Sequence, residues 1–194
     1  MKNILIIVIL LLTAFLVGCA SQTTEVVKPL TLLESALEVT QLLEAQNFEA
    51  LEAWIHPEKG VRFSPYGYVD LEKDLVIEKG QLTIKSKDTK VYNWGLYDGS
   101  GEPIELSFMD YYETFVYDVD FLNPEVIGIN TLIGMGNTYV NISEVYPNAE
   151  FVELHFNGID PQYEGIDWRS LYLIFEKVDS TWKLIAITHG QWTI

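Results

Sequence analysis

The alternation of apolar and polar side chains over the last third of the sequence constrains the fold most. Residues 150–156, 168–176 and 181–188 each place apolar side chains at every second position. This period of two is that of a strand that buries one face. A turn of hairpin length, Asp179-Ser180, separates the last two segments. The three segments therefore predict antiparallel strands. On the last strand the alternation assigns Ile185 and Ile187 to one face and Trp182, Leu184 and Ala186 to the other.

The first third of the sequence instead repeats its apolar residues at helical spacing. Thr31 precedes a stripe of leucines and predicts the start of a helix. Asn47 is a typical cap for a second, short helix that ends before Pro57. Ser107, with Asp110 three positions later, has the pattern of a capping box and predicts another helix. Helices first and long strands last predict an α+β domain, with N-terminal helices packed on a curved antiparallel sheet.

The middle of the sequence carries weaker patterns. We expect the Gly-rich segment 134–137 to be a turn, because a phosphate-binding loop would need a following helix and a lysine. The whole stretch 118–148 is expected to be mostly loop, since Gly, Asn and Pro recur in it. Short strands are expected at 61–63, 75–77, 82–84 and 91–97, with turns at 64–67 and 98–101.

A short apolar run at the start of the chain indicates export. Residues 4–17 follow Lys2 and are apolar except for one threonine. This is the length of a signal-peptide core, and is short of the roughly 20 residues that a spanning helix needs. The run ends in Leu-Val-Gly-Cys at 16–19, the pattern that a lipoprotein signal peptidase cuts after Gly18, before a lipidated Cys19. Acyl chains such as palmitate contribute about 0.8 kcal/mol of membrane binding per CH₂.

These features predict a signal peptide over 1–18, a lipidated Cys19 with a tether over 19–28, and one globular domain over 29–194. The protein would then be anchored through Cys19 to lipid of the cell membrane or outer membrane, on the extracytoplasmic face. The alternatives are an ordinary signal peptide with a chance cysteine and an uncleaved N-terminal anchor. A net charge of −16 argues against nucleic acid as a partner, because phosphates need compensating cations.

Two resemblances accompany these patterns. Phe48-Glu49-Ala50-Leu51, followed by the pair His56-Pro57, resembles the layout of NTF2-like (SnoaL-like, cystatin-type) domains. That resemblance implies a sheet curled into a cone against its helices. The chain also resembles a group of bacterial lipoproteins of the Firmicutes type, which implies lipid anchoring and no particular activity. The shared phrases stand here as HPEKGVRFSPY at 56–66, WGLYDGSGEPI at 94–104, FVYD at 115–118, DWRSL at 167–171 and QWTI at 191–194. Where this pattern would have an acid after His189, the chain has Gly190.

Several ionisable and aromatic side chains would converge if the sheet forms a cone. A histidine beside a carboxylate can do acid–base chemistry, and an arginine can bind an anion. The alternative is that His56 caps a helix end, that the arginines pair with carboxylates and that His189 is an ordinary strand residue. The candidate pocket residues are His56, Arg62, Trp94, Asp98, Asp167, Trp168, Arg169 and His189.

Metal and nucleophile patterns are weak. No pair of histidines has zinc spacing, and the acidic turn at 98–102 lacks the glutamate that closes a calcium loop. We expect no metal and no cofactor. The chain has 5 Trp, 11 Tyr and 9 Phe, and several of them, including Tyr66, Tyr68 and Tyr97, stand near turns. Aromatic side chains on turns favour a binding cleft for sugars or cell-wall fragments.

The leading expectation is a membrane-anchored extracytoplasmic lipoprotein that binds a small or glycan-like ligand without catalysis. A second possibility is a hydrolase or lyase that uses His56 or His189 with Asp98 or Asp167. The third is a protein–protein module of an envelope complex. The sequence leaves these three open.

Overall fold

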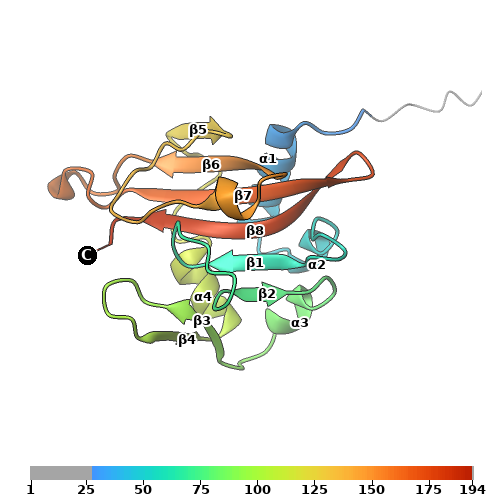
Figure 1. Cartoon of the computed structure of the whole chain (residues 1–194), viewed down its shortest axis with the longest axis horizontal. Helices are drawn as coiled ribbons and strands as arrows, with labels where there is room; N and C mark the ends of the chain where they lie inside the picture. Colours follow the sequence, from blue (N-terminus) through green and yellow to red (C-terminus); the bar gives the residue numbers. More distant parts are fainter. Residues whose placement is uncertain (1–27, 194) are drawn as a thin grey trace, which may run out of the picture.

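The computed structural model describes residues 28–193, and its main feature is a six-stranded mixed sheet (Figure 1). The strand order is β2-β1-β8-β7-β6-β5, and a separate two-stranded sheet pairs β3 with β4. The predicted signal peptide, Gly18 and Cys19 lie outside the described residues. In chain order the elements are α1 (Leu32–Glu44), α2 (Phe48–Leu51), β1 (Val61–Ser64), β2 (Leu75–Ile77), α3 (Leu82–Lys85), β3 (Tyr92–Leu96), β4 (Pro103–Leu106), α4 (Phe108–Phe115), β5 (Val126–Ile129), α5 (Ile142–Val145), β6 (Glu150–Phe156), the 3-10 helix η1 (Pro161–Tyr163), β7 (Arg169–Val178) and β8 (Thr181–Gln191).

The three long C-terminal strands confirm the alternation in the sequence. β6 pairs antiparallel with β7, and β7 pairs antiparallel with β8 through the predicted hairpin. The sheet is nevertheless not wholly antiparallel as expected. β1 runs parallel to β8, with Arg62 opposite Ala186, so the first strand of the chain lies beside the last.

The predicted helix starts are confirmed by their caps. The Thr31 hydroxyl accepts the amide of Glu34, whose carboxylate accepts the amide of Thr31 in return. The Asn47 side chain accepts the amide of Ala50 at 3.1 Å, and the Ser107 hydroxyl accepts the amide of Asp110 at 3.2 Å. Each cap satisfies an amide that the helix itself leaves without a partner.

One prediction in the middle of the chain is wrong for a tertiary reason. Residues 82–84 form the helix α3 instead of a strand. The distant carboxylate of Glu52 accepts the amides of Gly80 at 2.5 Å and Thr83 at 3.0 Å, and so caps this turn. The stretch 118–148 is mostly loop as expected, and β5 lies inside it. The alternate residues Ile127 and Ile129 of β5 are exposed. The strand is therefore held by its hydrogen-bonded pairing with β6, and not by burial of these two side chains.

A bulge in β8 overturns the predicted faces of that strand. Ile174 lies opposite Ala186 and Phe175 opposite Leu184, so Ile185 is an extra residue without its own partner. A bulge of this kind shifts the alternation by one position. Ile185 therefore packs with Ala186 on one side of the sheet, and Ile187 packs with Leu184 on the other.

The helices share a core with one face of the sheet. This cluster joins Ala36 and Val39 of α1 and Tyr112 of α4 to Leu171 and Leu173 of β7. Among the described residues no helix is long and apolar enough to cross a membrane. The cluster is rich in edge-to-face aromatic contacts, made by Phe48, Phe63, Trp94, Phe108, Tyr111, Tyr112 and Phe115.

The opposite face of the sheet is covered by an irregular segment, 130–141, which we call the strap. Buried Glu153 accepts the strap amides of Ile133 at 2.6 Å and Gly134 at 2.7 Å. The expected turn at 134–137 is wrong, because these residues run across the sheet. A Cβ on Gly134 would lie 2.7 Å from the ring of Trp168, so the glycine allows this close approach.

Candidate binding site

An open pocket of about 430 Å³ lies where three irregular segments meet. The first is the loop between β1 and β2, the second is the β3–β4 hairpin and the third is the strap. Three of its lining side chains are tyrosines and three are aspartates, so we call it the tyrosine pocket. Its lining residues are Pro65, Tyr66, Tyr68, Asp70, Lys73, Asp74, Leu96, Tyr97, Asp98, Gly99, Gly101 and Thr138.

The hairpin wall is built by glycines with positive φ. The amide of Tyr97 donates to the carbonyl of Glu102, and Gly101 donates back to Tyr97, which closes the predicted turn. Gly99 has φ of +83° and Gly101 has φ of +71°, a region that other residues adopt at a cost. The turn thus places Tyr97 and Asp98 at the rim of the pocket.

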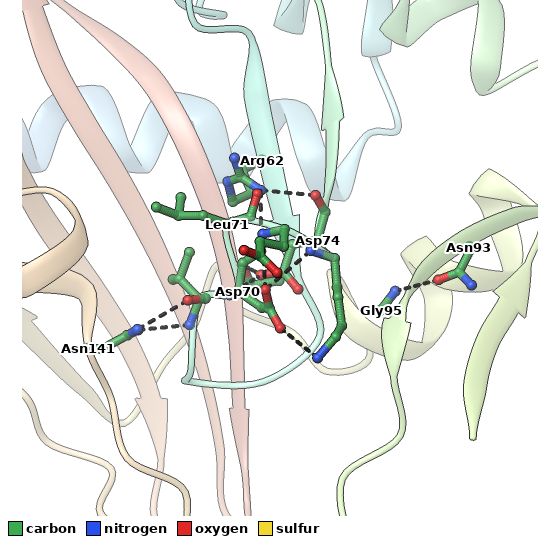
Figure 2. Close-up of polar contacts among 11 residues, drawn as sticks. Arg62, Asp70, Leu71, Asp74, Asn93, Gly95 and Asn141 are labelled. Carbon is green, nitrogen blue, oxygen red and sulfur yellow. Dashed lines mark hydrogen bonds and ion pairs between the residues drawn. The ribbon is translucent and has the colours of Figure 1, made fainter. Parts of the chain in front are cut away.

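Asp74 is the most unusual side chain of the pocket, because it is a carboxylate that is only 8 % exposed. Its Oδ2 atom accepts the Ser64 hydroxyl at 2.6 Å. The same atom accepts the amide of Asp70 at 2.8 Å (Figure 2). Its Oδ1 atom accepts no hydrogen bond from the described residues. Burial disfavours the charged form and raises the pKa of Asp74 to about 6, although the two hydrogen bonds act in the other direction.

Arg62 holds the loop that carries Asp74. Its guanidinium donates to the carbonyl of Asp74 at 2.9 Å and contacts the carbonyls of Asp70 and Leu71 at 3.4 Å (Figure 2). Within the same loop, Lys73 forms an ion pair with Asp70 at 3.1 Å. Arg62 therefore acts behind the pocket as a support, and does not line it.

Asp98 joins the hairpin to the strap and to the C-terminal residues. Its Oδ2 atom accepts the hydroxyls of Thr193 at 2.6 Å and Thr138 at 3.0 Å. The hydrogen bond from Thr193 stabilises the charged form and lowers the pKa of Asp98. Asp98 and Asp74 thus give the pocket two carboxylates with opposite shifts of the pKa.

The tyrosines differ in how freely they can meet a ligand. Tyr68 is 52 % exposed and Tyr97 is 37 % exposed. Tyr66 is partly buried, with its ring edge-to-face against Phe115 at 5.7 Å, and burial raises the pKa of Tyr66. All three are flat, amphipathic surfaces of the kind that sugars and cations bind.

His56 lies away from this pocket. Its Nδ1 atom accepts the amides of Glu58 and Lys59, each at 3.1 Å, so it caps the turn before β1. Burial lowers the pKa of His56. Its amide donates to Leu184, five residues before His189 on β8, a separation of about 17 Å along a strand. The two histidines are therefore not brought together.

His189 belongs to a closed group with Asp118 and Arg169, which we call the buried histidine cluster. His189 has no exposed surface, and its Nε2 atom lies 3.8 Å from the Asp118 carboxylate. Arg169 Nε donates to the same carboxylate at 2.8 Å. Burial lowers the pKa of His189, and the ring of Phe115 packs edge-to-face against it at 6.1 Å.

The remaining predicted residues divide between a smaller pocket and the core. Asp167 and Arg169 line a pocket of about 250 Å³ with Trp192. Trp168 packs under the strap, where its ring contacts Gly134 and Gly136. Trp94 is fully buried and stacks on Tyr111 at 4.0 Å. Of the eight predicted pocket residues, the tyrosine pocket therefore contains Asp98 alone.

The sequence offered a signal for some of the pocket and none for the rest. Tyr66, Tyr68 and Tyr97 were expected near turns, where they lie. Asp74 directly follows Glu72 and Lys73, and looks like a solvated loop acid in the sequence. Its burial comes from Ser64 and the neighbouring hairpin, which a local pattern does not contain. Within residues 28–193, no group of three His, Cys, Asp or Glu side chains could hold a metal ion.

Comparisons with known proteins add little to this geometry. No family model matches the chain, and no curated protein matches it. Among solved structures, a designed NTF2-like protein is similar at 10 % identity, over 81 % of this chain and 96 % of that chain. The TM-score is 0.32, which is too low to carry an argument about this chain. The class that the structure itself defines is an α+β domain with a mixed sheet and an open tyrosine pocket.

Proposed function

We propose that this protein is a lipid-anchored, extracytoplasmic binding protein that holds a small or glycan-like ligand in the tyrosine pocket. The observation that carries this proposal is the pocket itself: three tyrosines on turns around a buried aspartate, in an open space of about 430 Å³. This volume lies in the range of small-molecule sites, about 300–1,000 Å³. Aromatic faces with a few fixed polar groups are the usual means of binding sugars and amines.

The proposed anchor rests on the sequence before the described residues. Cys19 is the only cysteine of the chain and follows Leu-Val-Gly after an apolar run. The residues from Ala20 to Lys28 reach at most about 30 Å when extended. In Figure 1 the start of α1 and the β3–β4 turn lie at opposite ends of the molecule. A lipid on Cys19 would therefore leave the tyrosine pocket facing away from the membrane.

We also propose that the domain is an NTF2-like cone. The support is the order of its parts: a helix pair, then a strand that pairs with the last strand of a meander. Residues of α1, α2 and α4 share one core with a single face of the sheet. In this cone the interior is filled by aromatic side chains, and the ligand site lies at its rim.

The binding proposal is tested with the full chain in detergent on an array of bacterial cell-wall glycans and amino sugars. We expect binding that falls about tenfold or more in Tyr68→Ala and Tyr97→Ala, because each removes an aromatic face. Tyr163→Ala is the matched control, since Tyr163 is 53 % exposed but does not line the pocket. No binding to any member of the array, or equal loss in all three variants, would contradict the proposal.

The anchor has its own test. We expect Cys19→Ala to abolish metabolic labelling with a fatty acid and to release the protein from membranes. Cys19→Ser gives the closest steric control and should behave in the same way, because a hydroxyl is not the thiol that receives the lipid. Labelling that persists in either variant contradicts the anchor and leaves the pocket proposal standing.

A hydrolase- or lyase-type activity is the second candidate, and one observation favours it. The pKa of Asp74 is raised to about 6, and general acids and bases work best with a pKa near the working pH. Mass spectrometry of bound glycans after incubation tests it. Turnover that disappears in Asp74→Asn would support catalysis, and unchanged glycans would leave binding as the function.

A further inference from the structure

The charges around the tyrosine pocket are unequal, and this inequality indicates what it binds. Three carboxylates line it, those of Asp70, Asp74 and Asp98, against the single ammonium of Lys73. Lys73 is already paired with Asp70. The charges of Asp74 and Asp98 therefore have no cation from the pocket lining, and an anionic ligand would meet repulsion from both.

Asp74 has one oxygen atom free for a ligand. The side chain is about nine-tenths buried, yet only its Oδ2 atom accepts hydrogen bonds from the described residues. Gly95 lies next to this oxygen: a Cβ at that position would come within 3.3 Å of Oδ1. Because glycine has no Cβ, this side of the carboxylate is less crowded. Oδ1 is not among the buried side-chain atoms that lack a partner, so it can accept a donor or a cation that enters the pocket.

The tyrosines supply the second half of a cation site. Tyr66, Tyr68 and Tyr97 line the same pocket as Asp74. Aromatic faces attract cations through their negative quadrupole, and groups of them are the usual receptor for organic ammonium ions. Since residues 28–193 contain no group of three metal ligands, the chemistry favours an organic cation over a metal ion.

We propose that the tyrosine pocket binds an organic cation, an ammonium group on a small body, between its tyrosine faces and the carboxylates of Asp74 and Asp98. This inference rests on the proposed function and specifies its ligand class. The ammonium group lies near Asp74 Oδ1, and Tyr68 and Tyr97 cover it from the solvent side. Neutral ligands of the same shape bind more weakly, because they leave the negative charge of Asp74 uncompensated.

The site is also sensitive to pH through Asp74. The charged groups around this carboxylate are Arg62, which favours its charge, and Asp70, which opposes it. The phenols of Tyr111 and Tyr146 stand near it from α4 and from the loop after α5, and both stay neutral because burial raises their pKa. Protonation of Asp74 below about pH 6 removes one of the two charges that hold the cation.

The test uses a pair of probes that differ in charge and match in shape. Choline carries a permanent positive charge, and 3,3-dimethylbutan-1-ol replaces its nitrogen by carbon. We expect the full chain in detergent to bind choline about tenfold or more tightly than the alcohol at pH 7.5 in calorimetric or NMR titrations. Choline binding should weaken from pH 7.5 to pH 5, although the probe itself does not titrate.

Variants assign the effect to the pocket. Asp74→Asn should reduce choline binding about tenfold and remove its dependence on pH, while Asp98→Asn reduces binding and keeps that dependence. Glu105→Gln is the matched control, since it makes the same charge change on an exposed residue of β4 outside the pocket. Thermal melting of each variant shows whether it folds.

The outcomes separate this inference from the binding proposal. Equal binding of choline and the alcohol overturns the cation inference. The absence of choline binding at concentrations up to about 10 mM also overturns it. Glycans that still bind in a manner sensitive to Tyr68 and Tyr97 would then leave the binding proposal intact. Choline binding that Asp74→Asn leaves unchanged overturns the assignment to this pocket.

Discussion

The tyrosine pocket and the buried histidine cluster both combine carboxylates with cationic or aromatic neighbours, but they differ in access. His189 has no exposed surface and lies behind the ring of Phe115. Asp74 is almost as deeply buried, yet it lines an open pocket. From residue types, His189 and Arg169 were predicted to share one pocket with Asp98. The difference is that a ligand can reach the carboxylates of the tyrosine pocket, whereas the histidine of the buried cluster is closed to it.

The largest expected effect comes from adding an acid beside His189, where the lipoprotein pattern would have one. A Cβ on Gly190 would lie 2.9 Å from Tyr172, 3.0 Å from Ser170 and 3.1 Å from Trp168. Gly190→Asp should therefore cost about 4 kcal/mol or more, through overpacking and a buried charge. Urea unfolding followed by circular dichroism measures this loss.

Gly80→Asn serves as the control for Gly190→Asp. Unlike Gly190, Gly80 has a positive φ, of +87°, but a Cβ there meets nothing within 4 Å. We expect a cost of about 1 kcal/mol or less, because asparagine tolerates this conformation. If Gly190→Asp is as stable as Gly80→Asn, the region around His189 opens readily and the comparison fails.

Asp74→Asn should stabilise the protein at neutral pH. The pKa of Asp74 rises from 3.8 to about 6 on folding, so the folded state holds the proton more tightly than the unfolded chain. Stability contributed by this group is therefore present at low pH and is lost as pH rises from about 4 to 6. Asparagine has no such loss, so we expect a gain of about 2 kcal/mol at pH 7.5.

Urea unfolding at two pH values checks this expectation. The gain of Asp74→Asn over the natural chain should vanish at pH 4, where both side chains are neutral in the folded state. A variant that is less stable than the natural chain at pH 7.5 would show that the Asp74 charge supports the fold. The tyrosine pocket would then be a structural feature like the buried histidine cluster.

A feature can be predicted from the sequence when the residues that form it are close together in the chain. Thr31, Asn47 and Ser107 were predicted as caps because a cap contacts an amide three residues away. The helix α3 was missed because its cap comes from Glu52, 28 residues before Gly80. The pocket combines both cases, since its turn tyrosines were expected and the burial of Asp74 was not.

His189→Leu tests the buried histidine cluster through the pH dependence of stability. Burial lowers the pKa of His189, so below about pH 6.5 the unfolded chain takes up a proton that the folded state refuses. Stability then falls with decreasing pH, by up to about 1.4 kcal/mol per pH unit for each such proton. Leucine removes this proton, so the decline between pH 6.5 and 5 should become less steep.

Unfolding midpoints measured across this pH range give the result. His56 and His155 have pKa values lowered by burial as well, so part of the decline should remain in His189→Leu. An unchanged slope would mean that His189 is protonated in the folded state, as a catalytic histidine paired with Asp118 would be.

The smallest effect comes from two neighbouring phenols of α4. Tyr111 is buried with a hydroxyl that has no partner among the described residues, whereas the Tyr112 hydroxyl donates to the carbonyl of Leu43. Tyr112→Phe should cost about 1 kcal/mol, and Tyr111→Phe should be close to neutral. Chemical denaturation resolves the difference, and a larger cost for Tyr111→Phe would indicate that its hydroxyl serves the nearby Asp74.

The parallel pairing of β1 with β8 has a consequence for how the molecule matures. Arg62 and Ala186 face one another in the sheet although they are 124 positions apart in the chain. Closing so large a loop is slow compared with forming a hairpin. β1 can pair with β2 early, but a chain that emerges from a translocation pore N-terminus first must wait for its final strand before β1 joins the rest of the sheet. The tyrosine pocket at the end of β1 is thus assembled last. Under the proposed export and binding function, ligand capture would wait until transit is complete.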